Sequence, residues 1–186
     1  SPEEIKQNKI NQEQIKQEQV QKSSDTPSLD QDENFSKQSR KEALAENERI
    51  EFKNNNIIGT INTVGATIDD LTFKQYDTEL NSNEKVTLLN PRKVENGYLI
   101  ESGFVTNNKN IDVPNASTKW EIVGSKKLTD KNPIKLVWSN SQGITFEKNI
   151  SLDDQFLFTI KEKIINSSEK TYNFYSYAQI KRLRKP

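Results

Sequence analysis

The chain of 186 residues contains no cysteine, no histidine and no methionine. Without cysteine it can form neither a disulfide framework nor a thiolate metal site. Without histidine, acid–base catalysis would depend on carboxylates, lysine or tyrosine, and zinc would lack its usual ligands. Because methionine is absent even from position 1, we expect that the chain was cut from a longer precursor.

Long apolar runs and a net charge are also absent. No run of about 18 apolar residues occurs and no signal peptide is recognisable, so we expect any membrane anchor to lie in segments outside this chain. The formal net charge is zero, and the only basic cluster is the stretch 181–185 at the end. A nucleic-acid module would carry a denser basic stripe with interleaved aromatics, so we expect no nucleic-acid binding.

Residues 1–48 are rich in Gln, Glu, Lys, Asn and Ser, and they contain a single aromatic, Phe35. Apolar residues recur there every five positions, which corresponds to a rotation of about 140° on a helix, so they do not form a stripe. The helix propensity of the polar residues is compatible with transient helix, but without an apolar face little stabilises it. We predict a disordered polar linker over residues 1–48 and a folded domain over residues 49–186.

From Arg49 onward, short stretches of alternating apolar residues are separated by asparagine-rich turns. This pattern predicts an all-β, antiparallel β-sandwich. Turn chemistry at Asn140–Gly143 and at Ser151–Asp154 predicts two consecutive hairpins. After a start at Arg49–Phe52, the predicted strands are 57–63, 67–73, 86–89, 98–105, 118–123, 134–138, 144–150, 156–165 and 172–180.

Two apolar faces are expected in the core of this sandwich. One consists of Ile134, Leu136 and Trp138, and the other of Phe156, Phe158 and Ile160, and we expect them to oppose each other across a hairpin. Trp120 and Trp138 could instead stack on a sugar or a peptide. Because each has the apolar parity of its strand, we expect both in the core.

Paired acids at 69–70 and 153–154 are the only adjacent carboxylates in the folded part. Adjacent residues on a strand point to opposite faces, so we expect turns or β-bulges there rather than a two-carboxylate site. No calcium-binding loop pattern is present, and we predict no metal, no cofactor and no catalytic residues. Tyr172, Tyr175 and Tyr177 crowd the last strand and are the candidate partner-binding residues, although ordinary sheet propensity also explains them.

A series of short motifs resembles, in the same order, the large periplasmic domain of the YidC family of bacterial membrane protein insertases. The resemblance covers roughly residues 50–186, with Ser176 where the family usually has proline. The motifs are Gly59–Asn62, Gly65–Leu71, Glu101–Val105, Pro114–Trp120, Trp138–Phe146, Asp153–Phe158 and Tyr175–Pro186.

The resemblance implies a β-supersandwich related to galactose mutarotase, on the periplasmic side of the bacterial inner membrane. It implies an interaction and scaffold domain that catalyses no reaction and assists insertion and folding of inner-membrane proteins, with or without the Sec translocon. Its partners, reached through the full-length protein, would be Sec translocon subunits and nascent inner-membrane proteins. A passive spacer remains the alternative to a docking role.

Two further expectations follow from the resemblance. Family members continue with more strands, so we expect this domain to be truncated at its C-terminal side and the isolated fragment to be marginally stable or self-associating. Mutarotases need histidines that this chain lacks, so the competing function is a non-catalytic carbohydrate- or peptide-binding β-sandwich.

Overall fold

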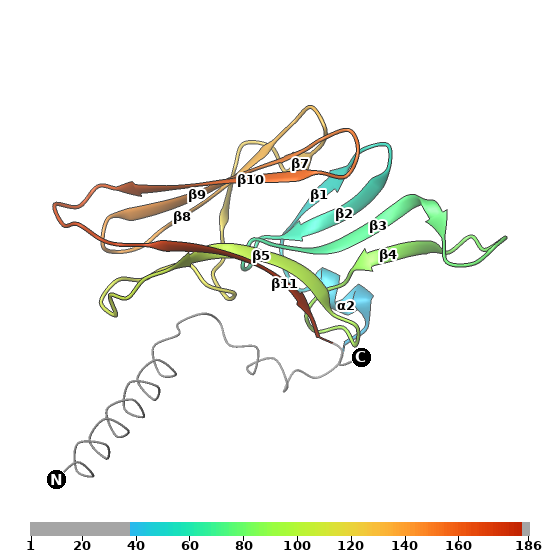
Figure 1. Cartoon of the computed structure of the whole chain (residues 1–186), viewed down its shortest axis with the longest axis horizontal. Helices are drawn as coiled ribbons and strands as arrows, with labels where there is room; N and C mark the ends of the chain where they lie inside the picture. Colours follow the sequence, from blue (N-terminus) through green and yellow to red (C-terminus); the bar gives the residue numbers. More distant parts are fainter. Residues whose placement is uncertain (1–37, 184–186) are drawn as a thin grey trace, which may run out of the picture. The chain divides into compact units, whose positions relative to one another are not determined.

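The computed structural model describes residues 38–183. Most of the predicted linker, residues 1–37, and the final residues 184–186 lie outside this range. Within it, eleven strands form two stacked sheets, and one short helix accompanies them (Figure 1). Neighbouring strands pair antiparallel, except for the short parallel pair β1 and β7. The predicted all-β antiparallel sandwich is confirmed.

The larger sheet has seven strands in the order β11-β5-β3-β2-β1-β7, with β4 paired to the outer half of β3. The smaller sheet has four strands in the order β10-β9-β8-β6. The strands of the larger sheet are β1 (Arg49–Lys53), β2 (Ile57–Asn62), β3 (Thr67–Asp77), β4 (Lys85–Leu89), β5 (Tyr98–Val105), β7 (Lys127–Leu128) and β11 (Tyr175–Arg182). Those of the smaller sheet are β6 (Glu121–Val123), β8 (Ile134–Ser139), β9 (Ile144–Leu152) and β10 (Phe158–Asn166).

The core lies between the two sheets and follows the alternation of the sequence. On β9, every second residue from Ile144 to Leu152 is buried, as a half-buried strand requires. Phe104 of the larger sheet meets Phe146 of the smaller one with ring centroids 5.5 Å apart. Trp120 is 2% exposed, and Trp138 packs on Phe146 at 5.7 Å, so both tryptophans lie where the sequence predicts them.

The expected opposition of two apolar faces is wrong. Strand β9 lies between β8 and β10, and Ile150 pairs with both Ile134 and Ile160. Directly paired residues point to the same side, so the two groups belong to one face of one sheet and pack together against the other sheet. Phe156 precedes β10 and is 46% exposed.

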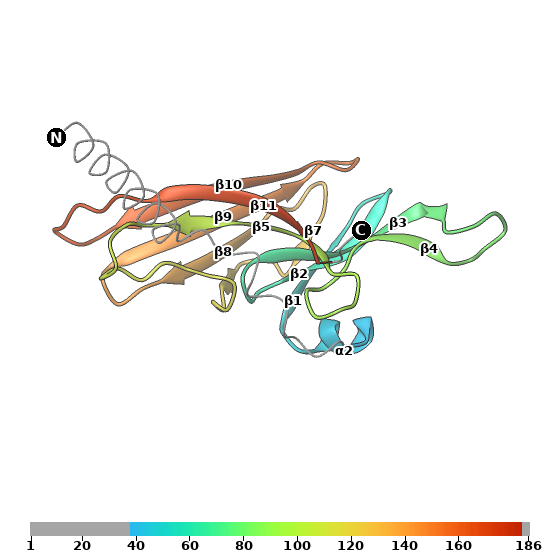
Figure 2. The ribbon, with the colours of Figure 1, turned by 60° about the horizontal axis from the view of Figure 1, so that its bottom comes forward.

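Helix α2 (Arg40–Ala45) lies within the segment that the sequence predicts as linker. Ser39 caps its first turn, and the side chain of Glu42 returns to the backbone nitrogen of Ser39, which forms a capping box. Ala43 is buried beneath the helix. The helix lies against the larger sheet, on the side facing away from β8–β10 (Figures 1 and 2), so ordered structure begins before Arg49.

Candidate interaction surface

A β-bulge brings two carboxylates to the outer face of the larger sheet, the face that α2 covers. Thr60 pairs with Asp70 while Ile61 pairs with Ile68, so Asp69 is the extra residue of β3. The predicted bulge is therefore confirmed. The expectation that Asp69 and Asp70 point to opposite faces is wrong, because the bulge interrupts the alternation.

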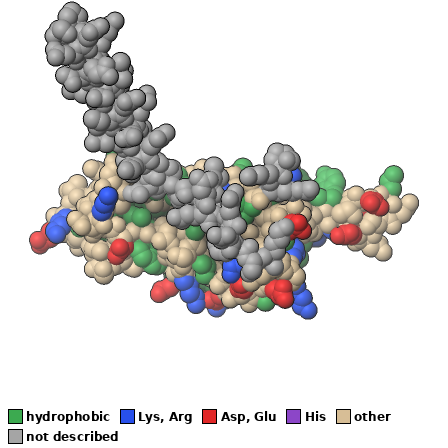
Figure 3. Space-filling model, turned by 90° about the horizontal axis from the view of Figure 1, so that it is seen from below, with side chains coloured by type: hydrophobic (Ala, Val, Ile, Leu, Met, Phe, Trp, Pro, Cys, Tyr) green, Lys and Arg blue, Asp and Glu red, His purple; other side chains and the backbone are tan. Residues whose placement is uncertain are grey.

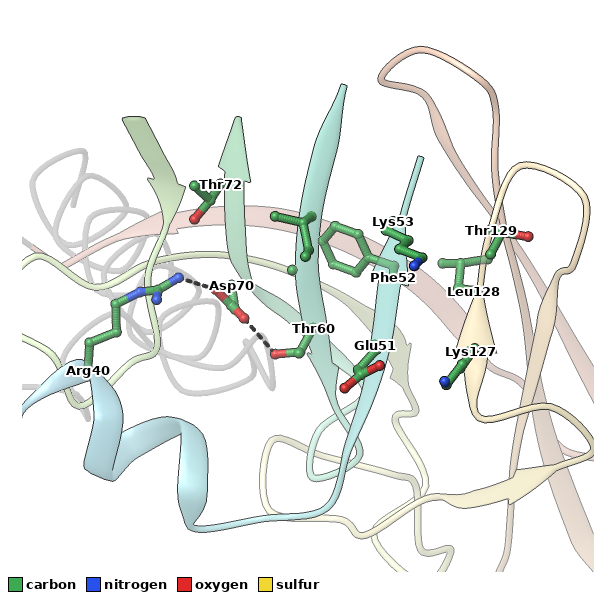
Figure 4. A pocket seen from close by; sticks show the side chains of 12 residues that line it. Arg40, Glu51, Phe52, Lys53, Thr60, Asp70, Thr72, Lys127, Leu128 and Thr129 are labelled. Atoms are coloured by element: carbon green, nitrogen blue, oxygen red, sulfur yellow. Dashed lines mark hydrogen bonds and ion pairs between the residues drawn. The ribbon is translucent and has the colours of Figure 1, made fainter. Parts of the chain in front are cut away.

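Each of these carboxylates is held by its own arginine. Arg49 forms an ion pair with Asp69, and Arg40 of α2 forms one with Asp70. Thr60 joins the two pairs, since its hydroxyl donates to Asp70 Oδ2 at 2.8 Å and accepts from Arg49 Nε at 2.6 Å. Figure 4 shows Arg40 and Thr60 approaching Asp70 from opposite sides.

Burial affects the pKa of one acid of this cluster, Asp69. Asp69 is 4% exposed, and the loss of hydration raises its pKa from 3.8 to about 6, against the opposing effect of Arg49. The nearby charge of Asp70 acts in the same direction as burial. Since each acid already has a cationic partner, the arrangement clamps β1, β3 and α2 together and leaves no free carboxylate pair.

A cleft of about 400 Å³ opens beside this cluster, over β1, β2, β3 and β7. Phe52, labelled in Figure 4, lies opposite Gly59 in the pairing of β1 with β2 and belongs to the floor of the cleft, with only 1% of its surface exposed. A Cβ at position 59 would lie 1.9 Å from the carbonyl oxygen of Asp70 and 2.5 Å from Phe52 Cζ. Glu51 and Lys127 also line the cleft, so it combines an apolar floor with charges of both signs.

A second hollow, which we call the hairpin groove, lies between the β3–β4 hairpin and the segment before β10. The hairpin extends beyond the rest of the larger sheet (Figure 2). The groove has a volume of about 660 Å³ and is mainly apolar. Its lining residues are Ile57, Leu71, Phe73, Tyr76, Asp77, Val86, Leu88 and Phe156.

Several large apolar side chains of the groove reach solvent. Tyr76 is 56% exposed, Leu88 41% and Phe156 46%, while Leu80 at the tip of the hairpin is 97% exposed. Figure 3 shows hydrophobic and acidic side chains on this projecting end. The groove is thus an exposed and mainly apolar surface.

The turn predicted at Ser151–Asp154 lies later in the structure, between the end of β9 at Leu152 and the start of β10 at Phe158, and it positions Phe156. Asp153 Oδ1 accepts hydrogen bonds from the backbone nitrogens of Gln155 and Leu157, at 2.9 and 2.8 Å. Asn54 Nδ2 donates to the carbonyl oxygens of Asp153 and Gln155, at 2.9 and 2.8 Å. The turn is therefore fixed to the turn between β1 and β2, and Phe156 meets Phe73 with ring centroids 6.0 Å apart.

The turn predicted at Asn140–Gly143 is also structural. Asn140 Oδ1 accepts from the backbone nitrogens of Gln142 and Ile144, at 3.0 and 2.9 Å, and its Nδ2 donates to the carbonyl oxygen of Asp112 at 2.8 Å. Gly143 supplies the positive φ of 82° that closes the turn. The motif from Trp138 to Phe146 therefore ties the hairpin to the loop before β6.

The three candidate tyrosines do not form one surface. Tyr172 packs on Phe174 with ring centroids 6.3 Å apart and joins the aromatic edge of the core. The ring of Tyr177 covers Gly103, and burial raises the pKa of its hydroxyl. Tyr175 is 53% exposed, so of the three it presents the largest share of its surface to solvent.

A buried lysine in the core escaped the sequence analysis. Lys148 is 1% exposed, and burial lowers its pKa. Its Nζ donates to Glu162 Oε1 at 2.6 Å and to the carbonyl and hydroxyl oxygens of Ser102 at 2.5 and 2.8 Å, and it lies 5.4 Å from the ring centroid of Trp120. The available signal was a lysine at an apolar position of β9.

Two negative findings concern residues 38–183 only. In this part of the chain, no group of three or more acidic side chains comes together in a way that could hold a metal ion. Nor does any helix in the same range have the length and apolar character needed to cross a membrane.

By its fold and its surfaces, the protein is an antiparallel β-sandwich domain with an exposed apolar groove at one end. Residues 49–186 match the family model of the YidC periplasmic domain, and the chain belongs to this family. It is therefore a periplasmic domain of a bacterial inner-membrane protein.

The chain is also similar to several curated relatives, each of which is called a membrane protein insertase YidC. The protein of Pelagibacter ubique is 69% identical over 164 residues, which cover 88% of this chain and 29% of the relative. Those of Mesorhizobium japonicum and Brucella suis are 34% and 36% identical over 148 residues, covering 79% of this chain and 24% of each relative. The chain thus spans less than a third of the length of these curated relatives.

Proposed function

We propose that this chain is the periplasmic interaction and scaffold domain of a membrane protein insertase. In this role it assists insertion and folding of inner-membrane proteins and catalyses no reaction itself. The family and the names of the relatives support the insertase setting. The observation that carries an interaction role is the hairpin groove, whose apolar lining is exposed at Tyr76, Leu88 and Phe156.

An exposed apolar groove favours docking over a passive spacer. Isolated apolar residues are ordinary on protein surfaces, whereas a contiguous patch with a polar surround is typical of a binding site. Aromatic residues are enriched at interfaces, and the groove includes Phe73, Tyr76 and Phe156. The turn at Asp153 fixes Phe156 in place, so little ordering of that side of the groove would oppose binding.

The proposed partners are Sec translocon subunits and nascent inner-membrane proteins, reached through the full-length protein. A second contact is proposed on strand β11, where Tyr175 would touch the partner. Tyr177 and Tyr172 would serve this contact by holding the strand, since one packs on Gly103 and the other on Phe174.

One observation favours a second candidate function, the binding of a carbohydrate or a peptide without catalysis. The cleft beside α2 has an apolar floor, to which the buried Phe52 belongs, and charged side chains of both signs around it. A hollow with an apolar floor and a few polar groups is suited to such ligands.

Site-specific photo-crosslinking in the full-length membrane protein tests the proposal. Crosslinkers would replace Tyr76, Phe156 and Tyr175, and an exposed position in the turn between β8 and β9, Ser141, would serve as the control. We expect translocon subunits or nascent membrane proteins in adducts from the first three positions and not from the control.

Adducts at equal yield from Ser141, or none from the groove, would contradict a docking role. Recovery of glycans alone, with a crosslinker beside Phe52, would instead favour the carbohydrate-binding function.

A further inference from the structure

One loop forms hydrogen bonds with both ends of the described domain. The loop spans residues 90–97, between β4 and β5, and we call it the latch loop. The backbone nitrogen of Gln38 donates to the carbonyl oxygen of Lys93 at 2.9 Å. The backbone nitrogen of Leu183 donates to the carbonyl oxygen of Gly97 at 2.8 Å. Residues just before α2 and just after β11 are therefore fastened to the same short segment.

Polar contacts fasten α2 to the sheet and to the latch loop. Arg40 forms the ion pair with Asp70 and donates from Nε to Asn90 Oδ1 at 3.1 Å. Ala43 is the only buried residue of the helix, so burial of apolar surface contributes little to its attachment. The attachment of α2 therefore depends mainly on side-chain hydrogen bonds and charge.

The ionic contacts of α2 differ in strength. The pair between Lys93 and Glu46 is solvent-exposed, with side chains 37% and 32% exposed, and such pairs contribute little. The side chain of Arg40 is 36% exposed, but that of its partner Asp70 is only 8% exposed, and Arg40 also bonds the latch loop. A hydrogen-bonded charge at a buried carboxylate contributes more, so Arg40 is the main fastener.

A single buried carboxylate connects the latch loop to strand β11. Glu101 of β5 is 5% exposed and forms an ion pair with Arg92 of the loop. The same carboxylate accepts a hydrogen bond from Gln179 Nε2 at 2.9 Å and lies 3.6 Å from Lys181 Nζ. Gln179 and Lys181 both belong to β11, so the loop and the strand share one counter-charge.

Strand β11 is the element that depends on this support. Among residues 38–183, it bonds to β5 alone. Its residue Ile180 is 66% exposed, and only Lys181 of the strand is buried. A strand with little burial opens locally before the core does.

We infer that α2 is a detachable latch, which acts through the latch loop to hold the C-terminal half of β11 in the sheet. While Arg40 is bound, the loop is held in place and supports Glu101 and Leu183. When α2 detaches, the folded domain starts near residue 49 instead of residue 38, and the C-terminal half of β11 loosens. The N-terminal connection of the domain thus controls the stability of a strand that is distant in the sequence.

Amide hydrogen exchange on the whole chain tests this inference. The variant Arg40→Gln removes the main fastener, and Lys41→Gln is the matched control, since Lys41 is exposed on the next residue of the same helix. For Arg40→Gln we expect exchange to rise about tenfold both in residues 40–46 and in 179–183. Amides of β9 should keep their wild-type rates, which also shows that the variant is folded. Lys41→Gln should match the wild type throughout.

A second variant tests the ranking of the contacts. Glu46→Gln weakens the exposed pair with Lys93 and should raise exchange in the same two segments by a smaller factor than Arg40→Gln. Faster exchange confined to residues 38–48 in Arg40→Gln would overturn the coupling to β11. An equal rise in β9 would show global destabilisation and would also overturn it, as would wild-type rates in every segment.

Discussion

The buried lysine of the core offers the sharpest test of the energetics. Replacement Lys148→Met keeps the length of the side chain but removes its three hydrogen bonds, two to Ser102 and one to Glu162. The carboxylate of Glu162 is then left in the core without its cation, with a side chain only 14% exposed. Loss of the cation over the ring of Trp120 lowers the stability by a smaller amount.

The expected loss of stability follows from the charge of Glu162, which stays in the core without a partner cation. Removal of one partner of a buried ion pair typically costs about 3–5 kcal/mol. Because Glu162 retains some access to water, we expect the lower end, about 3 kcal/mol, out of a total stability of about 5–15 kcal/mol for a domain of this kind. The double variant Lys148→Met/Glu162→Leu leaves no charge uncompensated, so it should recover at least about 2 kcal/mol of this loss.

Urea denaturation followed by tryptophan fluorescence measures these differences, because Trp120 and Trp138 both lie in or against the core. The control is Lys161→Met on the exposed side of β10, which should change the free energy of unfolding by less than about 0.5 kcal/mol. The reasoning is refuted if Lys148→Met costs no more than this control. It is equally refuted if the double variant is less stable than Lys148→Met, since the coupling between the two charges would then be absent.

Three further predictions concern the outer face and the turns. The pKa of Asp69 is about 6 in the folded state and 3.8 in the unfolded state, so the folded state binds the proton more tightly. The free energy of unfolding should therefore fall by up to about 3 kcal/mol as the pH rises from about 4 to above 6. Urea titrations of the wild type should show this slope, and those of Asp69→Asn should not. Gly59→Ala should disrupt the pairing of β2 with β3, because the added Cβ would meet a backbone oxygen. The control Gly124→Ala places its Cβ with no atom within 4 Å, so thermal unfolding should show a loss of only about 1 kcal/mol from backbone strain. Equal losses of stability in the two variants would contradict this prediction. Asn140→Ala should cost about 1–3 kcal/mol, since two backbone nitrogens and the Asp112 carbonyl lose their partner; unchanged stability in urea would show that water replaces these bonds.

Alternation and turn residues were sufficient to predict the fold class and most strands. Both signals are local, and β5 begins and ends where the sequence predicts. The short elements were missed for a physical reason: β7 has two residues and exists only because β1 pairs with it, and α2 has one and a half turns. A capping signature, Ser39 followed by Glu42, was present in the sequence but is too short to predict a helix by itself.

The surfaces were less predictable because they depend on register and on distant partners. The face on which Asp69 lies follows from a bulge, whose position is set by the pairing of β2 with β3. Tyr172 and Tyr175 are only three residues apart, yet one packs on the core and the other is exposed, since β11 begins at Tyr175 and Tyr172 lies in the segment before it. The hairpin groove joins residues separated by some eighty positions along the chain, such as Phe73 and Phe156.

The most direct test of the central claim is a co-purification measurement on the full-length membrane protein with the groove altered. The variant Tyr76→Ala/Leu88→Ala/Phe156→Ala removes the exposed apolar lining, and Lys161→Met serves again as the surface control. If the domain is an interaction module, recovery of translocon subunits should fall by about thirtyfold, the effect of losing one interface hot spot of about 2 kcal/mol, while protein level and folding stay normal. Unchanged recovery from a folded variant would contradict the claim that the domain acts through this groove.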